Sequence, residues 1–409
     1  GDGPRTVFVR HPESFFRKGL YQDNGVDYPD NAARFSLFAR AVTTWAVESE
    51  PPPDIVHGND WQSALAAVMI KLLPAGAIPA GKCRTVLTVH NLGYQGLFEP
   101  DAWSSLDLPP DLFGPQALEF YGRVNFLKGG LLYADLLTTV SERYAREVQT
   151  PELGMGLDGV LRARAEALRG ITNGIDGSWT PRSDPYLPEP FDRDRPFGGD
   201  GHSGKLAARR ALRDRLRLPG DRPGPLVVMI GRLVDAKGLD IVTEALDALM
   251  ERPLQLAVLG TGLSHYESYL REAQKRHAGK LAIEPDVSEP MRHLALGGAD
   301  ALLMPSHYEP CGEHQMMSVA YGTLPIVRAT GGLDDTVIDV TSDPSSGYGF
   351  KFQEHDAGSL LSAIDRAVAL HRQPDVWLAL MRRAMALDFS WDRAAGRYER
   401  AYREALGER

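Results

Sequence analysis

The chain has 409 residues, enough for two or three domains at about 150 residues each. Its 45 basic and 54 acidic residues give a net charge of −9, which argues against a nucleic-acid partner held by bulk charge. With only two cysteines, Cys83 and Cys311, a disulfide-stabilised secreted scaffold is not expected, and we predict a cytoplasmic protein. No stretch approaches the roughly 18 apolar residues of a spanning helix, and the N-terminus has no signal-peptide core, so no membrane partner is expected.

Short apolar runs alternate with helical patterns along the chain, which predicts parallel α/β sheets in two units. In the first part the expected helices are 31–47 and 62–73, and residues 97–134 read as a mostly helical insertion. The strands expected there are residues 6–9, one within 53–61, 85–89, 136–141 and the start of 169–176. Residues 177–203 are rich in Pro, Asp, Arg and Gly, which is typical of a polar linker with few buried contacts.

A second α/β unit is expected after this polar segment. Its strands are predicted at 225–230, 254–259, 281–283, 301–304 and 324–327. Its helices are predicted at 204–216, 239–251, 313–321, 358–373 and 392–406. The domains are therefore predicted as 1–183 and 204–385, both Rossmann-like, with 184–203 as the linker between them.

Residues 304–337 combine a buried strand, a loop, a helix and a second strand. Glu309-Pro310-Cys311-Gly312 stands directly before the helix. A helix N-terminus offers free N–H groups and a positive dipole end, which suits a phosphate or a set of sugar hydroxyls. The alternative is an ordinary strand–helix–strand unit with a capped helix.

Arg232 and Lys237 belong to the loop behind the strand at 225–230. Fixed cations in a dry cleft stabilise the charge that develops on a leaving diphosphate. The alternative is a pair of solvated loop cations. Gly260-Thr261-Gly262 follows the next strand, where it indicates either close backbone approach to a ligand or a simple tight turn.

Polar side chains also end the strands of the first part. His90 and Asn91 follow one strand, and Asp60 and Asn173 stand at equivalent ends of two others. Ligands bind at the carboxyl ends of parallel strands, although a buried structural role is the alternative for His90. His307, Cys311 and His314 would supply only three metal ligands without a second cluster, so we predict no obligatory metal.

Taken together, these motifs resemble bacterial glycogen synthase and plant starch synthase, which are retaining glucosyltransferases of the GT-B fold. The resemblance runs in family order over nearly the whole chain. Its blocks are DYPDNAARF, PDIVHGNDWQ, TVHNLGYQGLF, LEFYGRVNFLKGGLLYAD, TVSERYARE, GMGLDGVL, TNGID, GRLVDAKGLD, EPCGEHQM, YGTLPIVRATGGLDDTV and FSW. It implies two Rossmann-like domains facing a cleft, with residues 386–409 forming a helix that crosses back to the first domain.

The resemblance also implies transfer of glucose from a nucleoside diphosphoglucose, usually ADP-glucose, to the non-reducing end of an α-1,4-glucan. Arg232 and Lys237 would hold the diphosphate. Glu309 would contact the donor glucose, with N–H groups near Cys311 and Gly312. His90 would line the reacting sugar, with Asp60 and Asn173 on the first domain's cleft wall. Further substrate contacts are expected at Asn91, Tyr94, Gln95, Gly260, Gly262, Thr330, Gly331 and Gly332.

The chain departs from the family pattern in three places. The Lys-Thr-Gly-Gly-Leu loop that opens the family's first domain is absent, so the first sheet is expected to lack its opening strands. Glu313 and His314 stand where the family commonly has a Leu-like residue and Thr. The aromatic that often stacks on adenine is not found near Pro285, which leaves the nucleobase preference open.

Three hypotheses follow from these departures. In the first, the chain is part of an active synthase whose missing loop lies upstream, which the codons before Gly1 would test. In the second, it is a glucan- or nucleotide-binding relative without transferase activity, which incorporation of labelled glucose into polymer would exclude. In the third, the donor is UDP-glucose or the acceptor is another sugar. We favour the first and expect weak or no activity from this polypeptide alone.

Overall fold

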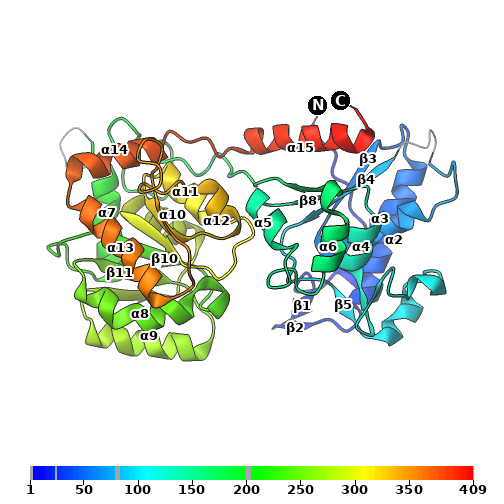
Figure 1. The fold of residues 1–409 in the computed structure, drawn as a ribbon, viewed down its shortest axis with the longest axis horizontal. Coiled ribbons are helices and arrows are strands. Elements are labelled where there is room, and N and C mark those ends of the chain that lie inside the picture. The colour runs from blue at the N-terminus through cyan, green and yellow to red at the C-terminus, as the bar shows by residue number, and fades with distance from the viewer. Residues whose placement is uncertain (1–2, 24, 79–82, 199–203, 409) are drawn as a thin grey trace. The chain divides into compact units, whose positions relative to one another are not determined.

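The structure, a computed structural model, describes residues 3–23, 25–78, 83–198 and 204–408. The chain forms two compact units. The first contains residues 1–140, 145–171 and 396–409, and the second contains 141–144 and 172–395. Each unit is built on a parallel sheet with helices packed against it (Figure 1), which confirms the predicted α/β fold class.

The second unit contains a six-stranded sheet in which every neighbouring pair is parallel. Its order is β12-β11-β10-β13-β14-β15. The strands are β10 (Leu226–Ile230), β11 (Gln255–Leu259), β12 (Leu281–Glu284), β13 (Ala301–Met304), β14 (Leu324–Arg328) and β15 (Phe350–Phe352). Because all six run the same way, the loops after β10, β11, β13 and β14 gather at one edge of the sheet.

Helices cover both faces of this sheet (Figure 1). One face packs against α8 (Leu239–Glu251), α9 (Ser264–Arg276), α13 (Ala357–His371) and α14 (Pro374–Ala384). The other face packs against α7 (Lys205–Leu216) and α10 (Glu289–Gly298). Two short helices, α11 (His314–Ala320) and α12 (Gly331–Thr336), follow the loops at the carboxyl edge.

The first unit has a four-stranded parallel sheet, a three-stranded antiparallel one and a two-stranded antiparallel pair, β1 (Gln22–Asp23) and β2 (Val26–Asp27). The parallel order is β3-β4-β8-β9, with β3 (Ile55–Asn59), β4 (Arg84–Val89), β8 (Leu136–Thr139) and β9 (Leu168–Gly170). The antiparallel order is β5-β7-β6, with β5 (Leu97–Phe98), β6 (Glu119–Phe120) and β7 (Arg123–Asn125). Its longer helices are α2 (Asn31–Glu48), α3 (Asp60–Lys71) and α4 (Phe126–Tyr133).

Several short elements complete the chain. They are α1 (Pro12–Phe15), β1 (Gln22–Asp23), β2 (Val26–Asp27), α5 (Glu142–Glu147) and α6 (Asp158–Ala163). Single 3-10 turns lie at η1 (Pro100–Ser105), η2 (Pro110–Leu112), η3 (Ala165–Ala167) and η4 (Asp235–Lys237). Within the ranges above, no helix is both long enough and apolar enough to span a bilayer.

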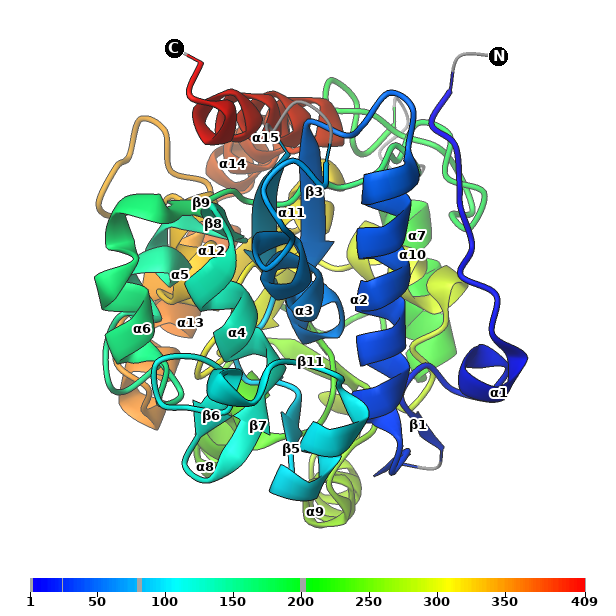
Figure 2. The same ribbon diagram turned by 90° about the vertical axis from the view of Figure 1, so that its right-hand side faces the viewer.

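The last helix, α15 (Trp391–Leu406), starts in the second unit and from Gly396 belongs to the first. Figure 2 shows it beside β3. The OH of Tyr402 lies 2.8 Å from His57 Nδ1, and His57 Nε2 lies 2.6 Å from Thr88 Oγ1. Burial lowers the pKa of His57 to about 4, so the imidazole is neutral at physiological pH. The helix therefore packs across β3, β4 and β8 of the first sheet with apolar and hydrogen-bonding contacts.

Three expectations about the fold need correction. Residues 6–9 pair as a strand with no residue in the described ranges, and they leave Val7 and Phe8 exposed. The insertion at 97–134 is a three-stranded sheet with 3-10 turns, and α4 is its one α-helix in the described residues.

The third correction concerns the linker and the first boundary. The predicted linker, as far as Gly198, belongs to the second unit. This unit begins again at Thr172, whereas the first domain was predicted to extend to residue 183. Leu187 and Phe191 are buried in its core, so this part is not an open tether. The remaining linker residues, 199–203, lie outside the described ranges.

Candidate active site

Two loops of the second unit meet at the carboxyl edge of its sheet. One loop, after β10, ends in the 3-10 turn that carries Lys237 and in Gly238. The other, after β13, carries Pro305 and Glu309. Gly238 has a φ of +78°, and a Cβ there would lie 2.2 Å from the Pro305 carbonyl oxygen. Glycine is therefore required at 238 both by the left-handed backbone and by the contact between the loops.

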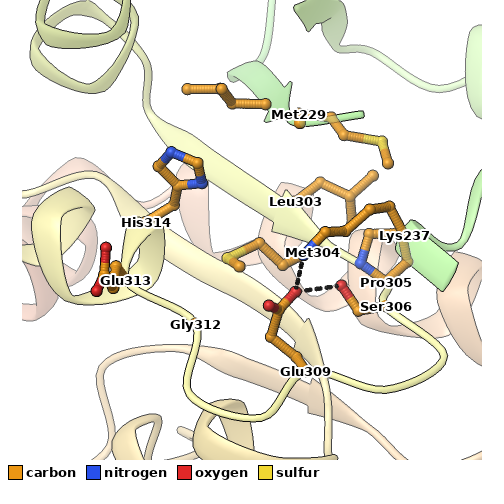
Figure 3. Close-up of a pocket in the computed structure, with 12 residues that line it drawn as sticks. Met229, Lys237, Leu303, Met304, Pro305, Ser306, Glu309, Gly312, Glu313 and His314 are labelled. Carbon is orange, nitrogen blue, oxygen red and sulfur yellow. Dashed lines mark hydrogen bonds and ion pairs between the residues drawn. The ribbon is translucent and has the colours of Figure 1, made fainter. Parts of the chain in front are cut away.

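Glu309 is the centre of this site. Its side chain is 10% exposed, and Lys237 Nζ lies 2.5 Å from its Oε2 atom. Ser306 Oγ donates a second hydrogen bond to the same oxygen at 2.9 Å (Figure 3). A buried carboxylate is tolerated when a cation and hydrogen bonds compensate for its lost hydration. The structure thus joins two predicted site residues and adds Ser306, which sequence reasoning did not select.

A cavity of about 60 Å³ opens beside this ion pair (Figure 3). Its walls combine the ends of two core strands with the polar groups of the loops. The lining residues are Met229, Ile230, Gly231, Lys237, Leu303, Met304, Pro305, Ser306, Glu309, Gly312, Glu313 and His314. A small cavity with an apolar floor and a few convergent polar groups has the character of a ligand site.

The loop at 309–312 packs directly on the turn at 330–332. Gly332 N–H donates to Glu309 O at 3.0 Å. A Cβ at Gly331, whose φ is +45°, would lie 2.0 Å from Glu309 O, and one at Gly332 would lie 1.8 Å from Cys311 O. These glycines allow two backbones to touch, and they hold the Glu309 loop in place. Thr330, the third predicted contact of this turn, is buried.

Arg232 and the pair Gly260 and Gly262 lie on neighbouring loops of the same edge. The Arg232 side chain is exposed, and the described residues offer its guanidinium no hydrogen bond or ion pair. A Cβ at Gly260 would lie 1.9 Å from Gly231 O, and one at Gly262 would lie 2.3 Å from Leu233 O. The close backbone approach predicted at these glycines is therefore made by the Arg232 loop itself.

Asn173 requires a correction, because we expected it on the first domain's wall. It belongs to the second unit, where its backbone N–H bonds to the Cys311 sulfur. Its Oδ1 atom is buried and has no hydrogen-bond partner among the described groups. Burial raises the pKa of the Cys311 thiol to about 12, so this thiol is protonated and unreactive at neutral pH.

His314 lies in the cavity wall near Glu309 and Lys237 (Figure 3). Burial, with smaller contributions from Lys237 and Arg292, lowers the pKa of His314 to about 4, and Glu309 opposes the shift. The ring is therefore neutral at pH 7, with one N–H donor and one acceptor.

We expect His314 to make the protein acid-sensitive. Between pH 6.5 and about 4 the unfolded state binds its proton first, so the free energy of unfolding falls as pH falls, by up to about 3 kcal/mol. Urea unfolding at several pH values should show a shallower fall in a His314→Leu variant. Identical pH profiles would contradict the prediction.

In the first unit the structure brings Asp60, His90 and Asn91 together. Asp60 has a φ of +57°, and its Oδ1 accepts the His90 N–H at 2.8 Å. Its carboxylate also accepts the Asn91 N–H, although burial raises the pKa of Asp60 above its usual value. His90 Nε2 lies 2.9 Å from Asn59 Oδ1. Asp60 thus holds the loop that presents His90.

Tyr94 and Gln95 differ in what they can offer a substrate. Tyr94 is 49% exposed. Gln95 is buried, and both ends of its amide are bound within the unit: Nε2 donates to Met155 O at 3.0 Å, and Oε1 accepts from Asn125 Nδ2 at 2.7 Å. Gln95 therefore supports the site rather than presenting free polar atoms.

The ranges that the structure covers contain no preformed metal site. No group of three or more His, Cys, Asp or Glu side chains there is placed to hold an ion. His307 is instead paired with His355, with the two ring centroids 4.8 Å apart, and His355 Nε2 lies 2.8 Å from Asp240 Oδ2.

Two family models together match most of the chain. Residues 2–163 match the family model of the starch synthase catalytic domain, and residues 210–377 match that of glycosyl transferases group 1. A glycogen synthase of Anaeromyxobacter sp. is 46% identical over 98% of this chain and 83% of its own length. One from Syntrophotalea carbinolica is 42% identical over 98% and 82%.

Solved structures agree. The catalytic domain of starch synthase IV from Arabidopsis thaliana, bound to ADP and acarbose, is similar with a TM-score of 0.85 and 33% identity, covering 98% of this chain and 81% of that one. A sucrose-phosphate synthase from Thermosynechococcus elongatus has a TM-score of 0.59 at 18% identity, which shows the shared fold alone.

Fold and matches together define a hexosyltransferase of the GT-B class. Within that class the chain belongs to the glycogen and starch synthase family, and its function is that of a glycogen synthase.

Proposed function

We propose that the protein transfers glucose from ADP-glucose to the 4-hydroxyl at the non-reducing end of an α-1,4-glucan, with retention of configuration. The observation that carries this proposal is the part-buried Lys237–Glu309 pair beside the cavity. The pair lies at the carboxyl edge of the sheet, where ligands bind in this type of fold.

In this reaction the bond from glucose C1 to the diphosphate oxygen breaks, and a bond from the glucan O4 to C1 forms. The nucleoside diphosphate leaves with the electron pair, and its freed oxygen takes the proton that the glucan hydroxyl loses. Arg232 and Lys237 would stabilise the charge on the leaving diphosphate. Glu309 would accept hydrogen bonds from the donor glucose once Lys237 turns to the phosphate. His90 would line the reacting sugar from its own unit.

A second cavity supports a nucleoside diphosphate donor. It measures about 480 Å³ and extends from the Gly260 turn to Pro285. Its lining residues are Leu233, Gly260, Thr261, Glu267, Arg271, Gln274, Lys275, Ile283 and Pro285. We propose that this cavity takes the nucleoside end, since it shares the 231–233 loop with the Arg232 site. The ADP bound to the starch synthase IV relative supports adenine over uracil.

Donor competition tests the proposal. With glycogen as acceptor and labelled ADP-glucose or UDP-glucose as donor, we expect kcat/KM for ADP-glucose to be higher by about tenfold or more. Equal or better use of UDP-glucose would overturn the donor assignment. Because the proposed diphosphate site is made of protein cations, transfer should also persist in EDTA, and loss of activity there would show a metal requirement.

A reducing, cytoplasmic compartment is part of the proposal. Cys83 and Cys311 are the only cysteines, and both are free thiols. Localisation of a tagged protein in fractionated cells would test it.

A further inference from the structure

An exposed aromatic side chain stands at the tip of a hairpin in the first unit. Tyr121 joins β6 to β7 and is 84% exposed. Its φ is +50° and that of Gly122 is +81°, a turn that favours Asn-Gly over a bulky residue. The ring of Phe120 packs edge-on against Tyr121 with centroids 4.7 Å apart. Neither burial nor turn chemistry accounts for a tyrosine at this position.

The hairpin tip packs against a second strained turn. Met155 has a φ of +49° and is 37% exposed, and Gly156 follows it with a φ of +80°. A Cβ at Gly156 would lie 2.9 Å from Phe120 Cζ and 3.7 Å from Tyr121 Cε2. Glycine at 156 therefore allows the two turns to meet.

Gln95 links both turns to the loop at residues 91–95, where substrate contacts are predicted. Its amide binds Met155 O on one side and Asn125 on the other. Asn125 lies at the end of β7, four residues after Tyr121 at the hairpin tip, which corresponds to about 13 Å of extended chain. In the described chain five non-glycine residues have positive φ, and two of them, Tyr121 and Met155, lie in these two neighbouring turns. Strain held in place by surrounding contacts is typical of ligand sites.

We propose that Tyr121, supported by Phe120 and by the turn at Gly156, is an outlying subsite for the α-1,4-glucan chain, where the tyrosine ring stacks on a sugar ring remote from the reacting end. The C–H face of a pyranose is apolar and its hydroxyls point outward, so an exposed aromatic ring buries the face while the hydroxyls stay hydrated. This inference rests on the proposed function for its ligand.

The test compares Tyr121→Asn with Tyr121→Phe. Asparagine suits positive φ and keeps the turn without the ring, whereas phenylalanine keeps the ring. We expect Tyr121→Asn to weaken glycogen binding about three- to tenfold in affinity electrophoresis, and Tyr121→Phe to bind like the parent. KM should rise for an acceptor of eight glucose units and stay unchanged for one of three. Trp45→Ala, which removes an exposed aromatic from α2, is the matched control and should change neither quantity.

Three results would overturn the subsite: glycogen binding by Tyr121→Asn equal to the parent's, equal losses in both Tyr121 variants, or equal losses for short and long acceptors. Gel retention needs no turnover. The binding measurement therefore decides the subsite even if this polypeptide alone transfers little glucose, whereas a preference for UDP-glucose in the donor competition would contradict the proposed function and leave the subsite standing.

Discussion

Lys237→Ala is expected to lower kcat by about a hundredfold or more and to leave glucan binding unchanged. The ammonium group is the cation nearest Glu309, at 2.5 Å, and its proposed role is to meet charge that grows on the leaving diphosphate. Removing one preorganised charge-stabilising group typically costs 10²–10³ in turnover. The measurement is glucose incorporation at saturating donor, with glycogen affinity as the second quantity. A kcat within threefold of the parent's would remove Lys237 from the site.

The same variant should also be less stable, because Glu309 would stay buried without its cation. We expect a loss of about 1–3 kcal/mol in the free energy of unfolding. The double variant Lys237→Ala/Glu309→Gln should recover most of that stability and none of the activity, which separates the two roles of the pair. Lys71→Ala, at an exposed lysine paired with Asp135 at 3.2 Å, is the surface control.

Gly332→Ala is expected to damage both stability and turnover. The new methyl group would lie 1.8 Å from Cys311 O, and the backbone at 332 needs no positive φ, so the collision itself is the cause. Relief requires the 309–312 loop to move, and with it Glu309. Overpacking of this kind costs about 1–3 kcal/mol, and a displaced catalytic group loses activity well beyond that.

Gly396→Ala provides the matched control for that variant. A Cβ at Gly396 meets no atom within 4 Å, and the residue lies inside α15. This change should therefore raise stability by about 0.5–1 kcal/mol. Thermal unfolding and donor turnover of the two variants decide the matter: a Gly332→Ala protein as stable and active as the parent would show that the turn adapts freely.

The local sequence pattern was sufficient to predict an element whose own apolar residues recur at a regular spacing. Helix α8 has the predicted bounds, Leu239–Glu251, because its apolar residues recur at helical spacing. Residues 6–9 have the composition of a strand, but a strand also needs a partner, and pairing is decided by distant chain. In the segment after Thr172, Leu187 and Phe191 are isolated apolar residues among polar ones, so no period indicates that they are buried.

In the candidate site, too, the sequence indicated individual residues, whereas only the structure shows which of them are in contact. Lys237 was selected in the loop behind a buried strand and Glu309 as a carboxylate just before a helix, and the family resemblance implied the role of each. Their direct contact joins residues 72 positions apart, and no spacing rule predicts it. Gly260 and Gly262 were predicted either to let a ligand approach the backbone or to form a tight turn, and the structure shows that the atoms approaching them belong to the Arg232 loop. Asn173 follows a first-unit strand in sequence yet packs on Cys311, which only three-dimensional contacts reveal.

The route of the chain through α15 has a consequence for synthesis. The first unit contains residues up to 171 but also 396–409, and Ala401 packs in one cluster with Val86, Leu136 and Ile171. Ala401 is translated hundreds of residues after the other three, and residues 172–395 of the second unit are translated in between. During translation the first unit's sheet therefore leaves these apolar side chains uncovered until α15 has been made, so this surface is the place where a nascent chain would need a chaperone.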